Sequence, residues 1–190
     1  MAHISILGTG NMGRAIAAVA GRGGHDVHLV GHHDTTTELG DVVVLAVPYP
    51  AVADVLATRG EALAGKIVVD ITNPLNFETF DSLTVPADAS ATAEIAAALP
   101  QSRVLKAFNT TFAATLSSGT VGPLPTTVLI AGDDTDAKTQ LAGIVTSGGL
   151  KAIDAGSLQR ARELEAIGFL QITLAAAERI SWTGGFGVVA

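Results

Sequence analysis

The stretch HISILGTGNMG, residues 3–13, joins a short apolar run to three glycines with the spacing G-x-G-x-x-G. The run His3–Leu7 predicts a strand, and the Ala- and Ile-rich residues that follow predict a helix over 11–22. A glycine turn between a strand and a helix is typical of a dinucleotide-binding unit. We therefore expect the first 34 residues to form such a unit, completed by a second strand over 26–31.

Each glycine of this turn has an expected task. Gly8 permits the tight turn, Gly10 lets a pyrophosphate approach the backbone, and Gly13 lets the helix pack closely on the strand. Free N–H groups at the helix N-terminus would bind the phosphates. The cofactor-binding residues expected here are Gly8, Thr9, Gly10, Asn11, Met12 and Gly13. The alternative is a turn that only joins strand to helix, and the surrounding strand–helix–strand unit argues against it.

The end of the second strand favours NADP over NAD. An acidic side chain there would bond the ribose 2′-hydroxyl and repel a 2′-phosphate. This chain instead has Gly31, His32 and His33, and the two imidazoles can donate hydrogen bonds to a phosphate. NAD stays an alternative cofactor because of Asp34, which follows Gly13 by about 20 residues and could reach a ribose. Two exposed histidines without a ligand are the other interpretation.

Apolar runs alternate with Ala-rich helical stretches along the rest of the chain, as in a parallel sheet with helices on both faces. Further strands are predicted over 41–47, 66–71, 103–107, 126–131 and 150–154, and further helices over 49–63, 90–98, 109–118, 134–148 and 157–181. The predicted fold class is α/β, a Rossmann-like, doubly wound and mostly parallel sheet. Residues 1–156 are expected to form an NADP-binding domain, and 157–190 a helix and tail packed on it.

The connection between the second and third strands is unusually short. Only residues 32–40 lie between them, whereas a parallel crossover normally takes about a dozen residues or more. We expect that a strand–helix pair common in such folds is missing here.

Composition excludes several classes of function. The formal net charge is −7, and the 11 Lys and Arg residues are scattered, which argues against binding to nucleic acid or a membrane surface. The sequence has no cysteine, which excludes thiolate and disulfide chemistry.

Four histidines lie between residues 25 and 33 without a clear carboxylate pair beside them, so no metal site is predicted. Because the first strand begins almost at once, no signal peptide is recognised and a cytoplasmic location is expected.

Further motifs give the chain a resemblance to a known family. With the glycine turn, Ala46-Val47-Pro48-Tyr49, Asp70-Ile71-Thr72-Asn73-Pro74 and Lys106-Ala107-Phe108-Asn109-Thr110 resemble the NADPH:F420 oxidoreductases. The last of these motifs and Asp154-Ala155-Gly156-Ser157-Leu158 are also similar to the cytosolic NADPH-binding domain of the STEAP metalloreductases.

The resemblance implies NADP(H) as cofactor, with F420 or FMN as a possible co-substrate. It places Val47, Pro48 and Tyr49 over the nicotinamide ribose, and Asn73 and Pro74 at the nicotinamide end. The alternative is that both prolines only mark loops after strands and do not contact a ligand. In the family a Ser-Arg pair binds the 2′-phosphate, and the two histidines that replace it here lose the fixed charge of Arg.

The expected activity is hydride transfer between NADPH and F420 or a flavin, which needs two aligned rings and little acid–base chemistry. We predict no catalytic residue beyond positioning, for which Asn73 and Asn109 are the candidates; Asn109 and Thr110 could instead cap a helix. The alternatives are a non-catalytic NADP(H) sensor and a reductase of a small imine or carbonyl. The terminal helix could cover its own sheet or pair with a second subunit in a homodimer.

Overall fold

The computed structural model describes residues 1–34 and 38–189, and within them seven strands form one sheet in the order β2-β1-β3-β4-β5-β8-β9. The strands are β1 (His3–Leu7), β2 (Asp26–Val30), β3 (Val42–Leu45), β4 (Ile67–Asp70), β5 (Arg103–Lys106), β8 (Thr127–Gly132) and β9 (Lys151–Gly156). The first five are parallel to one another, and β8 pairs antiparallel with β5. The expected Rossmann-like, mostly parallel α/β fold is confirmed.

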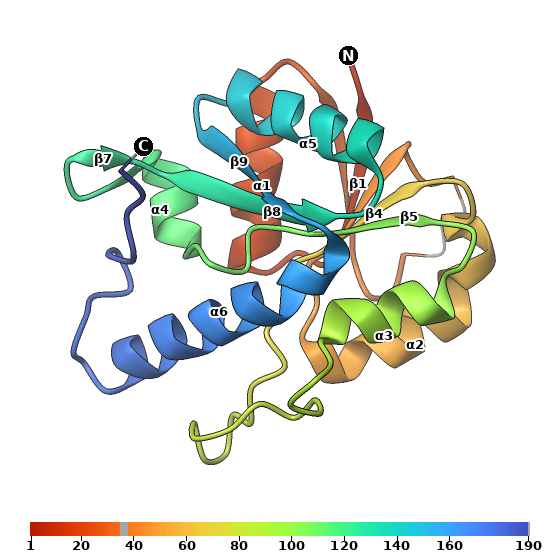
Figure 1. The fold of residues 1–190 in the computed structure, drawn as a ribbon. Coiled ribbons are helices and arrows are strands. Elements are labelled where there is room, and N and C mark those ends of the chain that lie inside the picture. Colours follow the sequence, from red (N-terminus) through yellow and green to blue (C-terminus); the bar gives the residue numbers. More distant parts are fainter. Residues whose placement is uncertain (35–37, 190) are drawn as a thin grey trace.

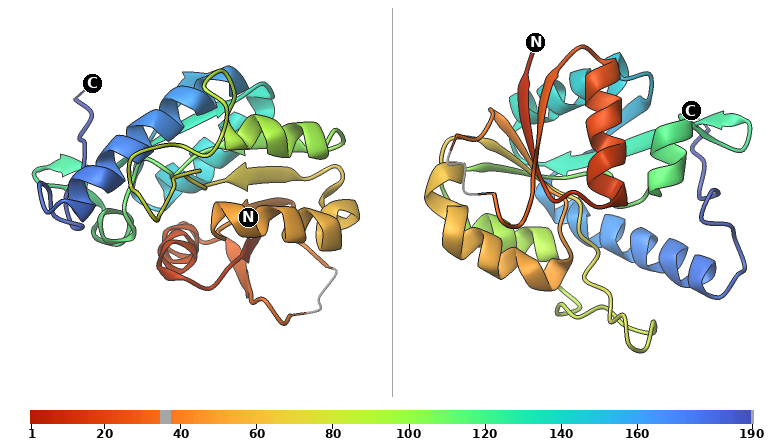
Figure 2. Two further views of the ribbon diagram at one scale, coloured as in Figure 1. Left: turned by 90° about the horizontal axis from the view of Figure 1, so that it is seen from below. Right: turned by 180° about the vertical axis from the view of Figure 1, so that it is seen from behind.

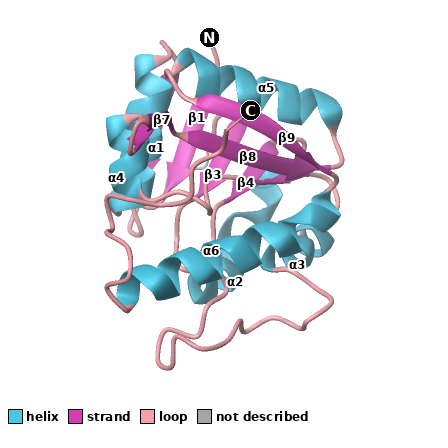
Figure 3. Ribbon diagram, turned by 60° about the vertical axis from the view of Figure 1, so that its left-hand side comes forward, coloured by secondary structure: helices cyan, strands magenta, loops and turns pink. Residues whose placement is uncertain are grey.

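Helices cover both faces of this sheet (Figure 1). They are α1 (Asn11–Arg22), α2 (Val52–Arg59), α3 (Ala91–Ala98), α4 (Ala113–Ser118), α5 (Thr135–Ser147) and α6 (Ala161–Ala176), with short 3-10 turns at Tyr49–Ala51, Gly60–Leu63 and Leu158–Arg160. Figure 3 shows α1, α4 and α5 on one face and α2, α3 and α6 on the other. No helix in the described ranges combines the length and apolar character that crossing a bilayer requires.

The strand β3 is apolar throughout because both of its faces are buried. In β3, Val42 and Val44 belong to the core under α1 and α5, whereas Val43 and Leu45 belong to the core under α2 and α3. A strand that alternates between two apolar layers has no polar side, which explains the unbroken run of valines.

The short link between β2 and β3 crosses from one side of β1 to the other, since β1 pairs with β2 on one side and β3 on the other. Its described parts, residues 31–34 and 38–41, hold neither helix nor strand. β2 is consequently an edge strand. The expected shortening of the fold between the second and third strands is confirmed.

Several helix boundaries differ from the sequence-based prediction. The helix expected over 49–63 is α2 with a 3-10 turn on each side, a further 3-10 turn precedes α6, and the start of α4 and the end of α6 also differ. α4 begins at Ala113 and not at residue 109, because Phe112, with a φ of −92° and a ψ of 155°, is extended and so cannot belong to a helix. Phe112 is the N-cap residue of α4, so the alternative that Asn109 or Thr110 caps this helix is wrong. α6 ends at Ala176 and not at residue 181, since Glu178 has a φ of 56° and the N–H of Arg179 bonds back to Leu174.

The C-terminal part of the chain docks on its own domain. Figure 2 shows the tail returning from the end of α6 past α4 and the hairpin of β6 (Thr120–Val121) and β7 (Leu124–Pro125), which the sequence did not predict. The Trp182 and Phe112 ring centroids lie 5.0 Å apart. The buried side chain of Gln171 on α6 accepts a 3.1 Å hydrogen bond from the N–H of Phe186. Polar and aromatic contacts thus fix the tail.

Candidate functional site

The residues expected to bind a cofactor gather along one edge of the sheet. The parallel strands β2, β1, β3, β4 and β5 all end at this edge, where open α/β sheets bind their ligands. Gly31, His32 and His33 follow β2, Gly8 to Gly13 follow β1, Val47, Pro48 and Tyr49 follow β3, Asn73 and Pro74 follow β4, and Asn109 follows β5. The structure therefore brings all of them to neighbouring strand ends.

The glycine turn is fixed to both strands beside it. The N–H of Gly8 bonds to Val30 at the end of β2, and the N–H of Ala46 bonds to Leu7 at the end of β1, both at 2.9 Å. Gly8 has a φ of 124°, and an added Cβ would overlap the carbonyl oxygen of Ala46. A Cβ on Gly13 would overlap the carbonyl oxygen of Gly8. Both positions therefore need glycine for the turn itself, before any ligand is considered.

Gly10 differs, because its empty side faces open space. A Cβ added there would have no described heavy atom within 4 Å, and its φ of −72° suits any residue. As the N-cap residue of α1 it provides no side chain to cap the helix, and the first turn holds no acidic residue. Arg14 bonds to the carbonyl of Thr9 at 2.8 Å and steadies the turn. An uncapped helix N-terminus beside an open glycine fits the pyrophosphate of a dinucleotide.

The residues after β2 present two exposed imidazoles. The rings of His32 and His33 meet edge to face with centroids 5.0 Å apart. Asp34 is the residue that left NAD as an alternative cofactor. Its carboxylate lies 3.8 Å from Nε2 of His28, a residue within β2. The main-chain carbonyl of Asp34 accepts a hydrogen bond from the guanidinium of Arg59 in the last turn of α2. Arg59 was not singled out from the sequence, because only the folded chain brings α2 to this loop.

The hydroxyl of Tyr49 is bonded to a residue of α3. It donates a hydrogen bond to Glu94 in the first turn of α3. Burial and the neighbouring Glu94 carboxylate raise the pKa of Tyr49 well above its ordinary value, so the phenol stays protonated. The half-buried Val47 and the exposed Pro48 are left to line the edge after β3.

Asn73 and Asn109 form a bonded pair at the ends of β4 and β5. The Asn109 amide donates to the Asn73 side-chain oxygen at 2.9 Å and to the Leu164 carbonyl at 2.8 Å, while the Asn73 amide donates to the Asn109 carbonyl at 3.0 Å. α6 lies so close to this pair that a Cβ on Gly168 would overlap the Asn73 side-chain oxygen. The pair thus joins two strand ends to α6, and Pro74 is buried beside it.

A fully buried ammonium group lies behind the Asn pair, and the sequence analysis did not single it out. The Nζ of Lys106 bonds to Asp70 at 2.8 Å, to Glu165 at 2.9 Å and to the carbonyl of Thr72 at 2.6 Å. Lys106, Asp70 and Glu165 have no appreciable solvent exposure. Each of the three ammonium protons therefore has an acceptor.

The second carboxylate of this cluster is balanced by backbone donors. Glu165 on α6 accepts hydrogen bonds from the N–H groups of Ala91 and Thr92 at the start of α3, at 3.0 and 3.3 Å. The positive end of a helix dipole stabilises a carboxylate at this place. The cluster joins β4, β5, α3 and α6, and it orders the chain that leads from Asp70 to Asn73. Asp70 and Lys106 are register partners at neighbouring strand ends, and this pairing is the signal that could have identified them.

Comparisons with known proteins show the family of this chain. Residues 29–74 match the model of the family described as NADP oxidoreductase, coenzyme F420-dependent. The chain is 35% identical over 155 residues to the F420-dependent NADP reductase of Methanothermobacter marburgensis, covering 77% of this chain and 68% of the relative. It is 34% identical over 139 residues to the reductase of the same name from Methanocaldococcus jannaschii, covering 71% of this chain but only 62% of that relative.

The resemblance to the STEAP proteins is also found: rat metalloreductase STEAP3 is 36% identical over 112 residues, 59% of this chain and 22% of the relative. Among solved structures, a putative F420-dependent NADP reductase from Arthrobacter sp. FB24 superposes with a TM-score of 0.86 at 26% identity, and both chains are covered completely. The chain belongs to the family of F420-dependent NADP oxidoreductases.

Proposed function

We propose that the protein transfers a hydride between NADPH and a deazaflavin of the F420 type, with a flavin such as FMN as a second possible acceptor. The observation that carries this proposal is the open side of Gly10 beside the uncapped start of α1, at the edge where β1 and β3 end. The names of the relatives support the deazaflavin as partner.

In this proposal the chain binds and aligns the cofactor and takes no covalent part. Backbone N–H groups at the start of α1 hold the pyrophosphate, the loop after β2 holds the adenosine end, and the ends of β3, β4 and β5 border the nicotinamide. NADPH supplies the hydride when bound, and NADPH, a proton and oxidised F420 become NADP⁺ and reduced F420. Asn73 and Asn109 act as positioning residues, because their bonds fix the two strand ends on which the ring would lie.

Two other functions use the same cofactor edge. A sensor would bind NADP(H) without hydride transfer, and a reductase of imines or carbonyls would need an acid near the substrate. The hydroxyl of Tyr49, the one tyrosine of the chain, is bonded to Glu94 on α3, which makes the carbonyl reductase the weaker alternative.

The direct test is turnover. The purified protein is mixed with NADPH and F420, then with NADPH and FMN, and the nicotinamide absorbance is followed. We expect NADPH to be oxidised with F420. Saturable NADPH binding without oxidation by either acceptor would refute hydride transfer and favour the sensor.

We also propose that a second copy of the chain packs against α6. Ile167 and Leu170 are 37% and 50% exposed on this helix. Phe77, 55% exposed, lies on the loop 71–90 between β4 and α3, which is visible below α6 in Figure 1. An apolar surface of this kind is the usual core of a homodimer contact. We expect gel filtration with light scattering to give twice the chain mass, and Leu170→Glu to give the monomer. A wild-type monomer at high concentration would contradict the proposal.

A further inference from the structure

If the protein binds NADPH as proposed above, the 2′-phosphate needs a positive charge near the end of β2. His32 and His33 lie there, but an imidazole lacks the fixed charge of a guanidinium. Between Arg22 and Arg59 the sequence has neither lysine nor arginine. A permanent charge for this phosphate must therefore come from another part of the fold.

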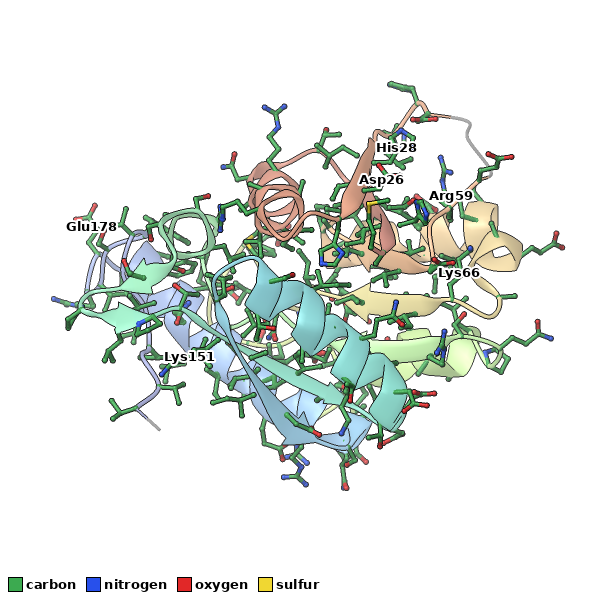
Figure 4. The ribbon with its side chains drawn as sticks, turned by 90° about the horizontal axis from the view of Figure 1, so that it is seen from above. Asp26, His28, Arg59, Lys66, Lys151 and Glu178 are labelled. Carbon is green, nitrogen blue, oxygen red and sulfur yellow. The ribbon has the colours of Figure 1, made fainter. Side chains whose placement is uncertain are left out.

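The structure brings Arg59 to this place. Its guanidinium donates a hydrogen bond to the carbonyl of Asp34, the residue that follows His33. One turn earlier on α2, Leu56 packs against the core cluster that contains Val30, the last residue of β2. Figure 4 shows Arg59 on the same side of the molecule as His28 of β2, with Lys151 and Glu178 on the other side. α2 thus places its terminal arginine at the loop that would hold the 2′-phosphate.

We propose that Arg59 supplies the fixed positive charge that selects NADPH over NADH. A guanidinium has five N–H donors in a planar fork that matches a phosphate, and it stays charged at every physiological pH. Its bond to the Asp34 carbonyl holds the group at the loop, so that little side-chain entropy is lost when a phosphate binds. The role that the family gives to an arginine after the second strand is in this chain performed from α2.

The competing explanation is that Arg59 only ties down the loop. Lys66 provides the matched comparison, because its Nζ donates to the carbonyl of Leu39 at 2.9 Å, at the other end of the same link. The two roles differ in one measurable respect. Loss of a residue that only holds the loop weakens the binding of all adenine nucleotides alike, whereas loss of a phosphate ligand weakens the binding of only those with a 2′-phosphate.

The test is calorimetric binding of four probes to the full chain: NADPH, NADH, adenosine 2′,5′-bisphosphate and 5′-AMP. We expect Arg59→Met to weaken NADPH and the bisphosphate about tenfold to a hundredfold, as for the loss of a hydrogen bond to a charged group, and to leave NADH and 5′-AMP unchanged. Arg59→Lys should recover part of the loss, because it keeps the charge but not the fork. Lys66→Met should not change the ratio of NADPH to NADH affinity.

The outcomes separate this inference from the proposed function. Equal weakening of all four probes by Arg59→Met, or no weakening at all, would overturn the role of Arg59 while NADPH binding by the wild type stands. If His32→Ala/His33→Ala removes the whole preference while Arg59→Met removes none, the histidines are the ligands and the inference is wrong. Failure of the wild type to bind any dinucleotide would instead refute the proposed function, and this inference with it.

Discussion

Lys106→Met is expected to lower the free energy of unfolding by about 3–5 kcal/mol, the usual cost of removing one partner from a buried ion pair. Methionine fills similar space, but it leaves Asp70 and Glu165 buried without the ammonium group that both now contact. It also leaves the Thr72 carbonyl without its 2.6 Å donor. Because Thr72 leads directly to Asn73, the end of β4 should loosen along with the global stability.

The measurement is thermal and urea unfolding followed by far-UV circular dichroism. For a chain of this size, each kcal/mol lowers Tm by roughly 2–4 °C, so the expected decrease is roughly 6–20 °C. Arg160→Met is the control, since its partner Glu163 lies 3.4 Å away and both side chains are about half exposed. An exposed pair contributes only about 0–1 kcal/mol. A Lys106→Met variant as stable as Arg160→Met would show that the two buried carboxylates do not need the ammonium group of Lys106.

A second variant separates unpaired charge from lost packing. In Lys106→Met/Asp70→Asn/Glu165→Gln both carboxylates become neutral amides of similar shape. Replacing a whole buried ionic group is often neutral, whereas breaking it is costly. We therefore expect this triple variant to be more stable than Lys106→Met alone. If it is less stable, the destabilisation comes from lost shape and hydrogen bonds, and not from the two uncompensated charges.

The sequence predicted the sheet and the glycine turn because both depend on local patterns. Apolar runs with two buried faces, such as Val42–Leu45, locate strands, and the spacing of three glycines after a strand locates the turn. Helix ends were less certain where one residue decides them. Glu178, just past the end of α6, adopts a positive φ that nothing in its residue type favours. The backbone hydrogen bonds that the N–H groups of Glu178 and Arg179 donate to the end of α6 hold this conformation.

The parts of the candidate site that join distant segments could not be predicted. Lysine is almost never fully buried unless paired, and the partners of Lys106 come from β4 and from α6, 59 residues later in the chain. Arg59 could not be predicted as a site residue for the same reason. Nothing in the sequence around the end of this helix indicates that the side chain contacts Asp34. Such contacts depend on which elements become neighbours, and this information is not contained in any short window of sequence.

Gly10→Ala is expected to abolish tight NADPH binding while leaving the fold intact. The alanine side chain has open space and an ordinary backbone conformation in the unliganded protein, so the free energy of unfolding should not change. In the proposed complex the same methyl group would stand where the pyrophosphate approaches the start of α1. Losing even one hydrogen bond from a backbone N–H to a charged phosphate weakens binding by about tenfold to a hundredfold.

Gly8→Ala provides the contrast, because the two positions are separated by Thr9 alone and yet the expected defect is different. At Gly8 the φ of 124° and the overlap with the Ala46 carbonyl distort the turn without any ligand, at a cost of about 1–3 kcal/mol for the backbone alone. Unfolding and NADPH titration of both variants test the distinction. A destabilised Gly8→Ala together with a stable Gly10→Ala that binds NADPH normally would mean that the glycines build the turn but the pyrophosphate does not rest on Gly10.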